Sequence, residues 1–225
     1  TGGLINIQKN KNPEIVFNQK KDISFQDHFS FKRLFYAISR AILSVAGAMH
    51  SQGVGRPEKI LCVLGHHLYV SQTRVIKAKY DKPIVVTKKI IDDIVTSDLQ
   101  SFYLKGDFKE FTDHNGPNVV LEKNNMRIKV NGYESTNPFG KEASDIEVSV
   151  FISVTPNGLL SDIRRIISTV FHSDEIYFGT FSFSIFNAMR DCLAKNENFA
   201  IFEIGSEITN LGIIKYGIIE ETFSF

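Results

Sequence analysis

Tryptophan is absent from this chain of 225 residues, and cysteine occurs only twice, at Cys62 and Cys192. Two cysteines do not make the disulfide framework of a small secreted domain, so their scarcity favours a reduced, cytosolic protein. Long apolar runs are also missing, since none approaches the roughly 20 residues that span a bilayer. The first residues lack the charged and then apolar order of a signal peptide. These absences argue against the secreted and membrane-spanning classes.

An excess of charge of either sign is missing as well. Lysine and arginine together number 26 against 25 acidic residues, which gives a formal net charge of +1. A nucleic-acid-binding surface needs concentrated basic side chains, and only the short run from Lys9 to Lys21 has them. We interpret this run as a solvated hairpin edge, because lysine on an exposed edge strand discourages pairing between sheets. No nucleic-acid partner is therefore predicted.

Residues that commonly form catalytic or metal sites are not grouped at useful spacings. His66 and His67 are adjacent in an expected strand, so their side chains point to opposite faces and cannot chelate one metal. Asp92 and Asp93 fall on the polar side of an expected helix, where paired carboxylates are usually solvated. No catalytic residue is predicted.

Apolar periodicity predicts an α/β chain. Between Phe31 and Ala46 the apolar residues recur at the i, i+3, i+4, i+7 spacing of a helix that lies against a sheet. Residues Ile60–Leu64 are apolar almost throughout and predict a strand covered on both faces. A second helical stripe extends from Leu159 to Val170. Strand, helix and strand in this order are typical of the α/β class.

Residues 65–154 have a different pattern, typical of a compact α+β unit. Apolar and polar residues alternate after His66, which predicts strands with one wet face. A helix follows Thr87, and residues 103–118 are expected to form a polar surface loop. Chain reversals are expected at Asn124 and Asn125 and again over residues 131–133. Further strands are predicted over residues 119–121, 128–130 and 146–154. The predicted order is strand, helix, strand, strand.

Three tyrosines of this unit are expected at the margins of its half-covered sheet. They are Tyr69, Tyr80 and Tyr103. Exposed tyrosine beside a sheet suits contacts with other proteins or with an added peptide strand. We therefore predict that recognition of a partner occurs on this unit.

The last segment predicts a buried strand that leads into a hairpin. It is apolar from Phe199 onward and ends in Glu203, Ile204 and Gly205. Small residues at such a turn let backbone N–H groups close on phosphate oxygens, while the acid at the strand tip can hold the water shell of Mg²⁺. An ordinary hairpin is the alternative interpretation of this segment by itself.

The order of these segments resembles the family of the bacterial cell-division protein FtsA and its relative, the pilus-assembly protein PilM. The resemblance covers nearly the whole chain, and the stretches on which it rests are GLINI from Gly3, PEIVF from Pro13, KILCVLG from Lys59 and IEVSVFISVTPNGLL from Ile146. It implies an actin-like ATPase fold of the ribonuclease-H-like type with an inserted α+β subdomain. The implied parts are residues 1–64 and 155–197 of one actin-like subdomain, the insertion at 65–154, and the start of a second actin-like subdomain at 198–225.

The resemblance also implies a nucleotide site in the last hairpin. Its residues are Glu203, Gly205, Ser206 and Thr209, with Glu203 as the metal ligand for Mg-ATP. The family hairpin usually reads Asp-Ile-Gly-Gly-Gly-Thr-Thr-Asp, whereas here Glu207 places a carboxylate beside the phosphates and Ile208 removes a hydroxyl. We expect a degenerate site and at most a weak ATPase. We interpret the chain as a fragment without the first phosphate loop and the C-terminal half, and expect no nucleotide on it.

By the same resemblance, the expected function is an FtsA-like cytoskeletal scaffold for cell division. Such a protein forms filaments in the cytoplasm at the inner face of the cell membrane, with ATP as a conformational ligand and membrane contact only through parts outside this chain. The alternative is a PilM-like component that holds a peptide of a membrane partner in pilus assembly. A sugar or acetate kinase of the same superfamily is a third interpretation, for which we find neither a catalytic acid nor a substrate loop.

Overall fold

The computed structural model describes residues 1–23, 31–53, 55–66, 68–104, 117–193, 196–205 and 209–225, without the side chains of residues 31 and 101–104. The chain is a mixed α/β protein that divides into two compact units. The first consists mainly of residues 1–62 and 156–178, and the second mainly of residues 63–104, 118–155 and 179–225. These units are coarser than the four parts expected from the sequence, and that division stays a prediction.

The first unit contains two short sheets and two helices. Its elements are β1 (Gly2–Asn6), β2 (Glu14–Gln19), α1 (Phe31–His50), β3 (Ile60–Leu64), α3 (Asn157–Phe171) and β8 (Ile176–Thr180). Strands β1 and β2 form an antiparallel hairpin in which Gly2 pairs with Gln19. Strands β3 and β8 form the other sheet, where the N–H of Ile60 donates to the carbonyl of Glu175 at 2.9 Å.

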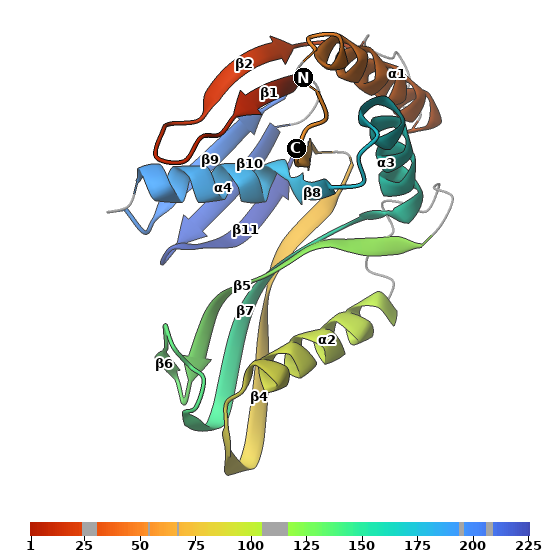
Figure 1. Cartoon of the computed structure of the whole chain (residues 1–225). Coiled ribbons are helices and arrows are strands. Elements are labelled where there is room, and N and C mark those ends of the chain that lie inside the picture. The colour runs from red at the N-terminus through yellow and green to blue at the C-terminus, as the bar shows by residue number, and fades with distance from the viewer. Residues whose placement is uncertain (24–30, 54, 67, 105–116, 194–195, 206–208) are drawn as a thin grey trace. The chain divides into compact units, whose positions relative to one another are not determined.

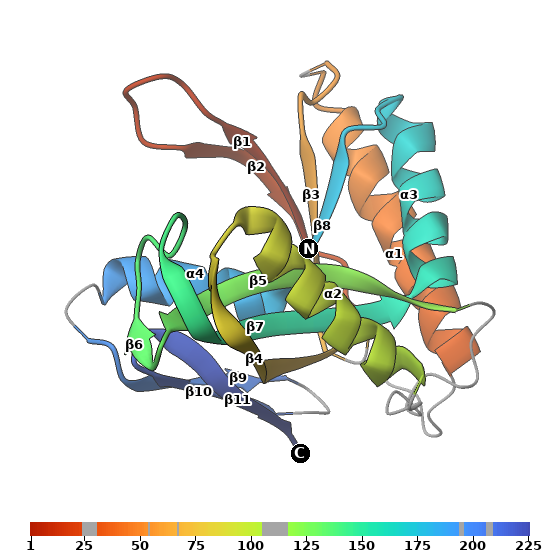
Figure 2. The ribbon, with the colours of Figure 1, turned by 90° about the horizontal axis from the view of Figure 1, so that it is seen from below.

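Helices α1 and α3 lie side by side in this unit (Figure 1, Figure 2). The apolar stripe predicted for α1 buries Val45 and Ala46, which confirms its helical periodicity. Strand β1 approaches α1 closely at Gly2, where an added Cβ would lie 2.6 Å from Cγ1 of Val45 and 2.7 Å from Sδ of Met49. Glycine at this position therefore allows the strand to lie against the helix. The buried residues of α3 are Leu159, Ile163, Ile167 and Phe171.

The prediction that β3 is covered on both faces is wrong. Leu61 is 68% exposed, while Leu64 on the other face is buried. Within the described residues β3 pairs only with β8, so a two-stranded sheet provides too little neighbouring structure to cover both of its sides.

The second unit is built around a four-stranded sheet. Its first elements are β4 (Val70–Val85), α2 (Lys88–Leu104), β5 (Asn118–Val130), β6 (Tyr133–Glu134) and β7 (Glu142–Pro156). The strand order is β4-β7-β5-β6, and β4 is antiparallel to β7 from the pair Val70 and Val154 to the pair Lys79 and Asp145. Strand, helix, strand and strand follow one another as the sequence predicts, with the two-residue strand β6 in addition. Figure 2 shows α2 lying across one face of this sheet.

Strand β5 is longer than predicted, and the reversal expected at Asn124 and Asn125 is wrong. Both asparagines lie inside β5, which extends to Val130. Pairing with β7 overrides the local turn preference of asparagine at this point. The reversal predicted over residues 131–133 is confirmed, with φ angles of 51° at Asn131 and 84° at Gly132. The predicted polar loop falls mostly on residues 105–116, outside the described residues.

Strand β7 is buried on both faces because different elements cover its two sides. Its even-numbered residues from Ile146 to Val154 belong to the core beneath α2, together with Val95 of that helix. Its odd-numbered residue Phe151 belongs to a second core with Phe186. Alternation along one strand therefore connects two hydrophobic cores.

The second core is completed by a helix and a three-stranded sheet. These elements are α4 (Phe181–Cys192), β9 (Phe199–Ile204), β10 (Thr209–Lys215) and β11 (Ile218–Ser224). The strands are antiparallel in the order β11-β10-β9, which confirms the hairpin predicted from the last segment. Ile214 and Ile219 contribute the buried side chains of this sheet.

Candidate functional site

The hairpin of β9 and β10 turns Glu203 toward the interior of the second unit. Glu203 pairs directly with Asn210 in the antiparallel register, so both side chains lie on the same face of the sheet. The neighbours Phe202 and Ile204 point to the opposite face and are 62% and 81% exposed. Alternation along β9 thus places the acid inside and the large apolar residues outside.

Glu203 and Asn210 are joined by a hydrogen bond. Nδ2 of Asn210 donates to Oε2 of Glu203 at 3.0 Å. Burial raises the pKa of Glu203, and the hydrogen bond from Asn210 opposes this rise. Asn210 itself is only 6% exposed, and its Oδ1 has no partner in the described part of the chain.

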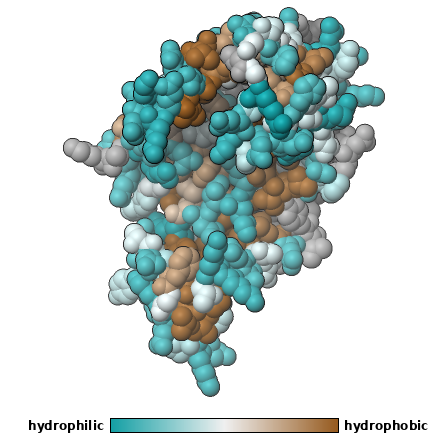
Figure 3. Space-filling model, in the orientation of Figure 1, coloured by the Kyte–Doolittle hydropathy of each residue, from teal (hydrophilic) through white to brown (hydrophobic). Residues whose placement is uncertain are grey.

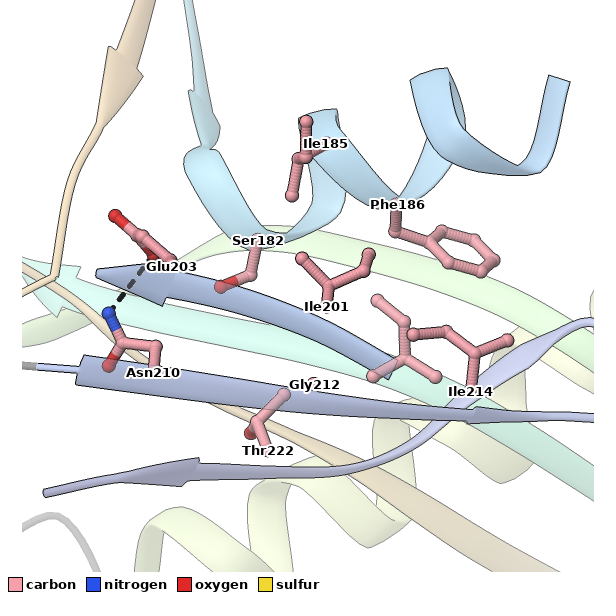
Figure 4. Close-up of a pocket in the computed structure, with 10 residues that line it drawn as sticks. Ser182, Ile185, Phe186, Ile201, Glu203, Asn210, Gly212, Ile214 and Thr222 are labelled. Carbon is pink, nitrogen blue, oxygen red and sulfur yellow. Dashed lines mark hydrogen bonds between the residues drawn. The ribbon is translucent and has the colours of Figure 1, made fainter. Parts of the chain in front are cut away.

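These two residues line a small cavity between the sheet and α4 (Figure 4). Ser182, Ile185 and Phe186 of α4 form one wall, and Ile201 lies beside Glu203 on the strand. The cavity has about 20 Å³ of space, which is enough for one water molecule. The other lining residues are Asn210, Gly212, Ile214, Ile219 and Thr222.

A polar network lies next to the cavity, at the start of α4. The hydroxyls of Tyr69 and Ser182 are 2.8 Å apart, and the N–H of Ser182 donates to the Tyr69 hydroxyl at 3.2 Å. The ring of His66 lies between two serines, with Nε2 3.5 Å from Oγ of Ser182 and Nδ1 3.3 Å from Oγ of Ser224. Burial raises the pKa of Tyr69 to about 12, so this hydroxyl keeps its proton at neutral pH.

Glu122 of β5 is the second inward-facing acid of this unit. It accepts hydrogen bonds from the hydroxyl of Thr180 and, at 3.4 Å, from that of Ser153. Thr180 is also the N-cap of α4 and accepts from the N–H of Phe183 at 3.3 Å. Burial raises the pKa of Glu122, and these hydrogen bonds oppose the rise. A carboxyl group at a helix N-terminus stabilises the helix, which is a structural role.

The residues predicted for nucleotide binding are only partly brought together. Thr209 begins β10 and exchanges two backbone hydrogen bonds with Phe225, of 2.8 and 3.0 Å. Gly205 follows the end of β9, and Ser206 lies outside the described residues. The nucleotide role of these residues stays a prediction.

The geometry around Glu203 does not fit a Mg-nucleotide site. Mg²⁺ usually keeps several waters in an octahedral shell, whereas this cavity has room for about one. The lining residues identified in the described part of the chain include neither lysine nor arginine to balance a triphosphate. Burial also disfavours the charged carboxylate that a metal would need.

The three tyrosines predicted to be exposed differ in how far the structure buries their side chains. The prediction is wrong for Tyr69, which is 1% exposed and hydrogen-bonded to Ser182. Tyr80 is half-buried and packs against the core beneath α2. Tyr103 lies in the last turn of α2, and its side chain is outside the described residues. A substitution such as Tyr69→Glu would bury a charge and disrupt the fold.

Sequence reasoning missed Asn210 and Ser182 as members of this site. The register of the hairpin was a usable signal for Asn210, because a polar residue in an apolar strand stands opposite Glu203. Nothing local indicates Ser182, because its partner Tyr69 is 113 residues away in the sequence.

Part of one side of the sheet β4-β7-β5-β6 is open, and we name this part the open face. It is formed by Val75, Lys77 and Lys79 of β4, Lys129 of β5 and Glu147 of β7. Glu147 pairs with Lys77 at 3.3 Å and with Lys129 at 2.8 Å, and the hydrogen bond from Lys129 is the main cause of its lowered pKa. Val75 is 54% exposed while its neighbour Ile76 is buried, which confirms the alternation along β4. The same side is covered where Phe151 of β7 lies in the second core, so the predicted wet face is confirmed for only part of the sheet. In the lower part of Figure 3, where Figure 1 shows both α2 and β4, apolar residues lie among hydrophilic ones.

The described residues lack both a membrane-spanning helix and a cluster of metal-binding side chains. None of their helices combines the length and the apolar character needed to cross a membrane. None of their histidines, cysteines, aspartates and glutamates form a group of three or more suited to holding a metal ion.

No family model and no curated protein matches this chain. Among solved structures, it is similar to a chain of the "PilM-PilN type IV pilus biogenesis complex", with a TM-score of 0.51 and 11% sequence identity. The match covers 98% of this chain and 57% of that chain. The present chain thus corresponds to little more than half of its structural neighbour. At this identity the likeness shows a fold of the PilM type and does not extend to activity.

Proposed function

We propose that this chain is part of an actin-like scaffold protein of the PilM type, which binds a partner protein in pilus assembly. The observation that supports this proposal is the shared fold over 98% of the chain with a protein from a PilM-PilN complex. The FtsA-like role in cell division and the filaments expected from it have no comparable support. A cytoplasmic position at the inner face of the membrane belongs to the same proposal.

We place partner binding on the open face. A segment of a partner can lie across this part of the sheet, where Val75 offers an apolar contact between charged side chains. Lys77 is 64% exposed and remains accessible although it pairs with Glu147. Since Glu147 is shared between Lys77 and Lys129, an incoming acidic group finds two lysines that are only partly neutralised.

Co-purification tests the proposal. The protein is produced together with a PilN-type protein from the same genome, and complex formation is measured by size-exclusion chromatography and calorimetry. We expect a stoichiometric complex whose affinity falls at least about tenfold when Lys77→Glu and Lys129→Glu are combined, because each reversal opposes charge complementarity.

The matched control is Lys89→Glu, at an exposed position of α2 away from the open face. This variant is expected to bind like the wild type. Absence of a complex contradicts the PilM-type function, whereas a complex that the open-face variant binds equally well contradicts the location alone.

A further inference from the structure

The inward orientation of Glu203 leads to an assignment separate from partner binding. We propose that Glu203 and Asn210 hold one water molecule beneath α4, and that this polar site replaces the Mg-nucleotide site implied for the hairpin. The hairpin then serves as a structural element, and the protein works without a nucleotide at Glu203.

The unpartnered oxygen of Asn210 is the first observation behind this assignment. Oδ1 is buried and lacks a partner in the described part of the chain, although Nδ2 of the same amide is bound to Glu203. A buried carbonyl oxygen without a hydrogen bond lowers stability, so native proteins usually supply a donor or an ordered water. The cavity beside it provides the place for that donor.

The volume of the cavity and the polar residues that line it favour a water molecule as its occupant. Its space of about 20 Å³ exceeds the roughly 10 to 15 Å³ that one water needs, and leaves no room for a hydrated metal ion. A buried water also needs two to four polar partners. Glu203, Asn210, Ser182 and Thr222 all line the cavity and offer them. Figure 4 shows these polar groups toward one end, with Phe186 and Ile214 toward the other.

The surroundings of Glu203 also separate this site from a phosphate site. Ile185, Phe186 and Ile201 keep the carboxyl group in an apolar environment. Burial raises the pKa of Tyr69 to about 12, so this neighbour of the cavity is uncharged at neutral pH and contributes no positive charge. Burial also raises the pKa of Glu203 above its ordinary value, although the hydrogen bond from Asn210 opposes the rise, and this burial disfavours a metal-binding carboxylate.

The substitution Glu203→Gln tests the assignment, because it keeps the shape and removes the charge. We expect its melting temperature at pH 7 to equal or exceed that of the wild type. We also expect that titration of the wild type with Mg-ATP in a calorimeter gives no saturable heat that depends on Mg²⁺. The Glu203→Gln variant should give the same result as the wild type. The matched control is Glu221→Gln, at an exposed position of β11, which should leave both measurements unchanged.

A crystal structure of the protein soaked with MgCl₂ and ATP completes the test. One water within hydrogen-bond distance of Oδ1 of Asn210 supports the assignment. A metal ion on Glu203, a dry cavity, a clear loss of melting temperature in Glu203→Gln, or Mg-ATP binding that this variant abolishes would overturn it. None of these outcomes depends on whether a pilus partner binds.

Discussion

Tyr69 and Ser182 are 113 residues apart in the sequence, yet they are joined by two hydrogen bonds in the second unit. The Tyr69 hydroxyl lies 2.8 Å from that of Ser182 and accepts from the Ser182 N–H at 3.2 Å. Tyr69 immediately precedes β4, and Ser182 is in the first turn of α4. The contact therefore links the beginning of β4 directly to α4, the helix that lines the candidate cavity.

The first prediction concerns this link. Tyr69→Phe should lower the free energy of unfolding by about 1 to 3 kcal/mol, because it leaves the N–H of Ser182 without its buried acceptor. Chemical denaturation measures the change. Tyr133→Phe is the control, since Tyr133 is 81% exposed and its substitution should cost less than about 0.5 kcal/mol. Equal stabilities of the two variants would contradict the structural role of Tyr69.

The second prediction concerns pH and Glu122. Burial raises the pKa of this group above its ordinary value of 4.5. Its contribution to stability is therefore complete below about pH 4.5 and is lost as the pH rises through the higher pKa of the folded state. Thermal unfolding should show that Glu122→Gln, relative to the wild type, becomes more stable with rising pH above 4.5.

The control for this titration is Glu134→Gln, at an exposed position of β6. Its stability relative to the wild type should stay constant over the same pH range. Glu122→Gln is also expected to carry a constant cost in addition to the pH-dependent difference, because glutamine has one acceptor oxygen for the two hydroxyls that bind Glu122. The absence of any pH-dependent difference is the result that contradicts the prediction.

The third prediction compares two glycines of the first unit. Gly2→Ala should destabilise the protein by about 1 to 3 kcal/mol, because the new methyl group meets Val45 and Met49 at closer than contact distance. Gly47→Ala in α1 meets no atom within 4 Å and should stabilise the helix by up to about 1 kcal/mol. Denaturation curves of both variants give the comparison, and effects of the same sign would show that β1 does not lie against α1 as described.

The fourth prediction concerns the outer face of the sheet β9–β11. Phe202, Leu211 and Phe223 are cross-strand neighbours on this face, and both phenylalanines are substantially exposed. Apolar rows of this kind favour association, so the 225-residue chain should self-associate with rising concentration in sedimentation experiments.

Phe202→Glu combined with Phe223→Glu should shift that equilibrium toward the monomer by at least about tenfold, since charged side chains cannot be buried without cost. Tyr133→Glu, at an exposed position outside this sheet, is the matched control. Association that continues unchanged in the double variant would mean that another surface is responsible.

The local elements and their inner faces were determined by the sequence itself. The stripe of α1, the alternation along β4 and the hairpin after Phe199 are all present in the structure. Periodicity is sufficient here because the repeat distances of helices and strands decide which side chains share a face. The alternation in β9 even decided that Glu203 and Phe202 point in opposite directions.

Which faces are covered, and by what, was decided only by the tertiary structure. Tyr69 is buried because α4 folds against it, and the turn-forming pair Asn124 and Asn125 remains extended because β7 pairs with β5. Glu203 has the residue type of a metal ligand, but burial among apolar side chains raises the pKa of its carboxyl group, against the hydrogen bond from Asn210. The spacing of residues in the sequence determines which side chains of one segment share a face. The desolvation and hydrogen bonding of those side chains depend on the segments that pack against that face.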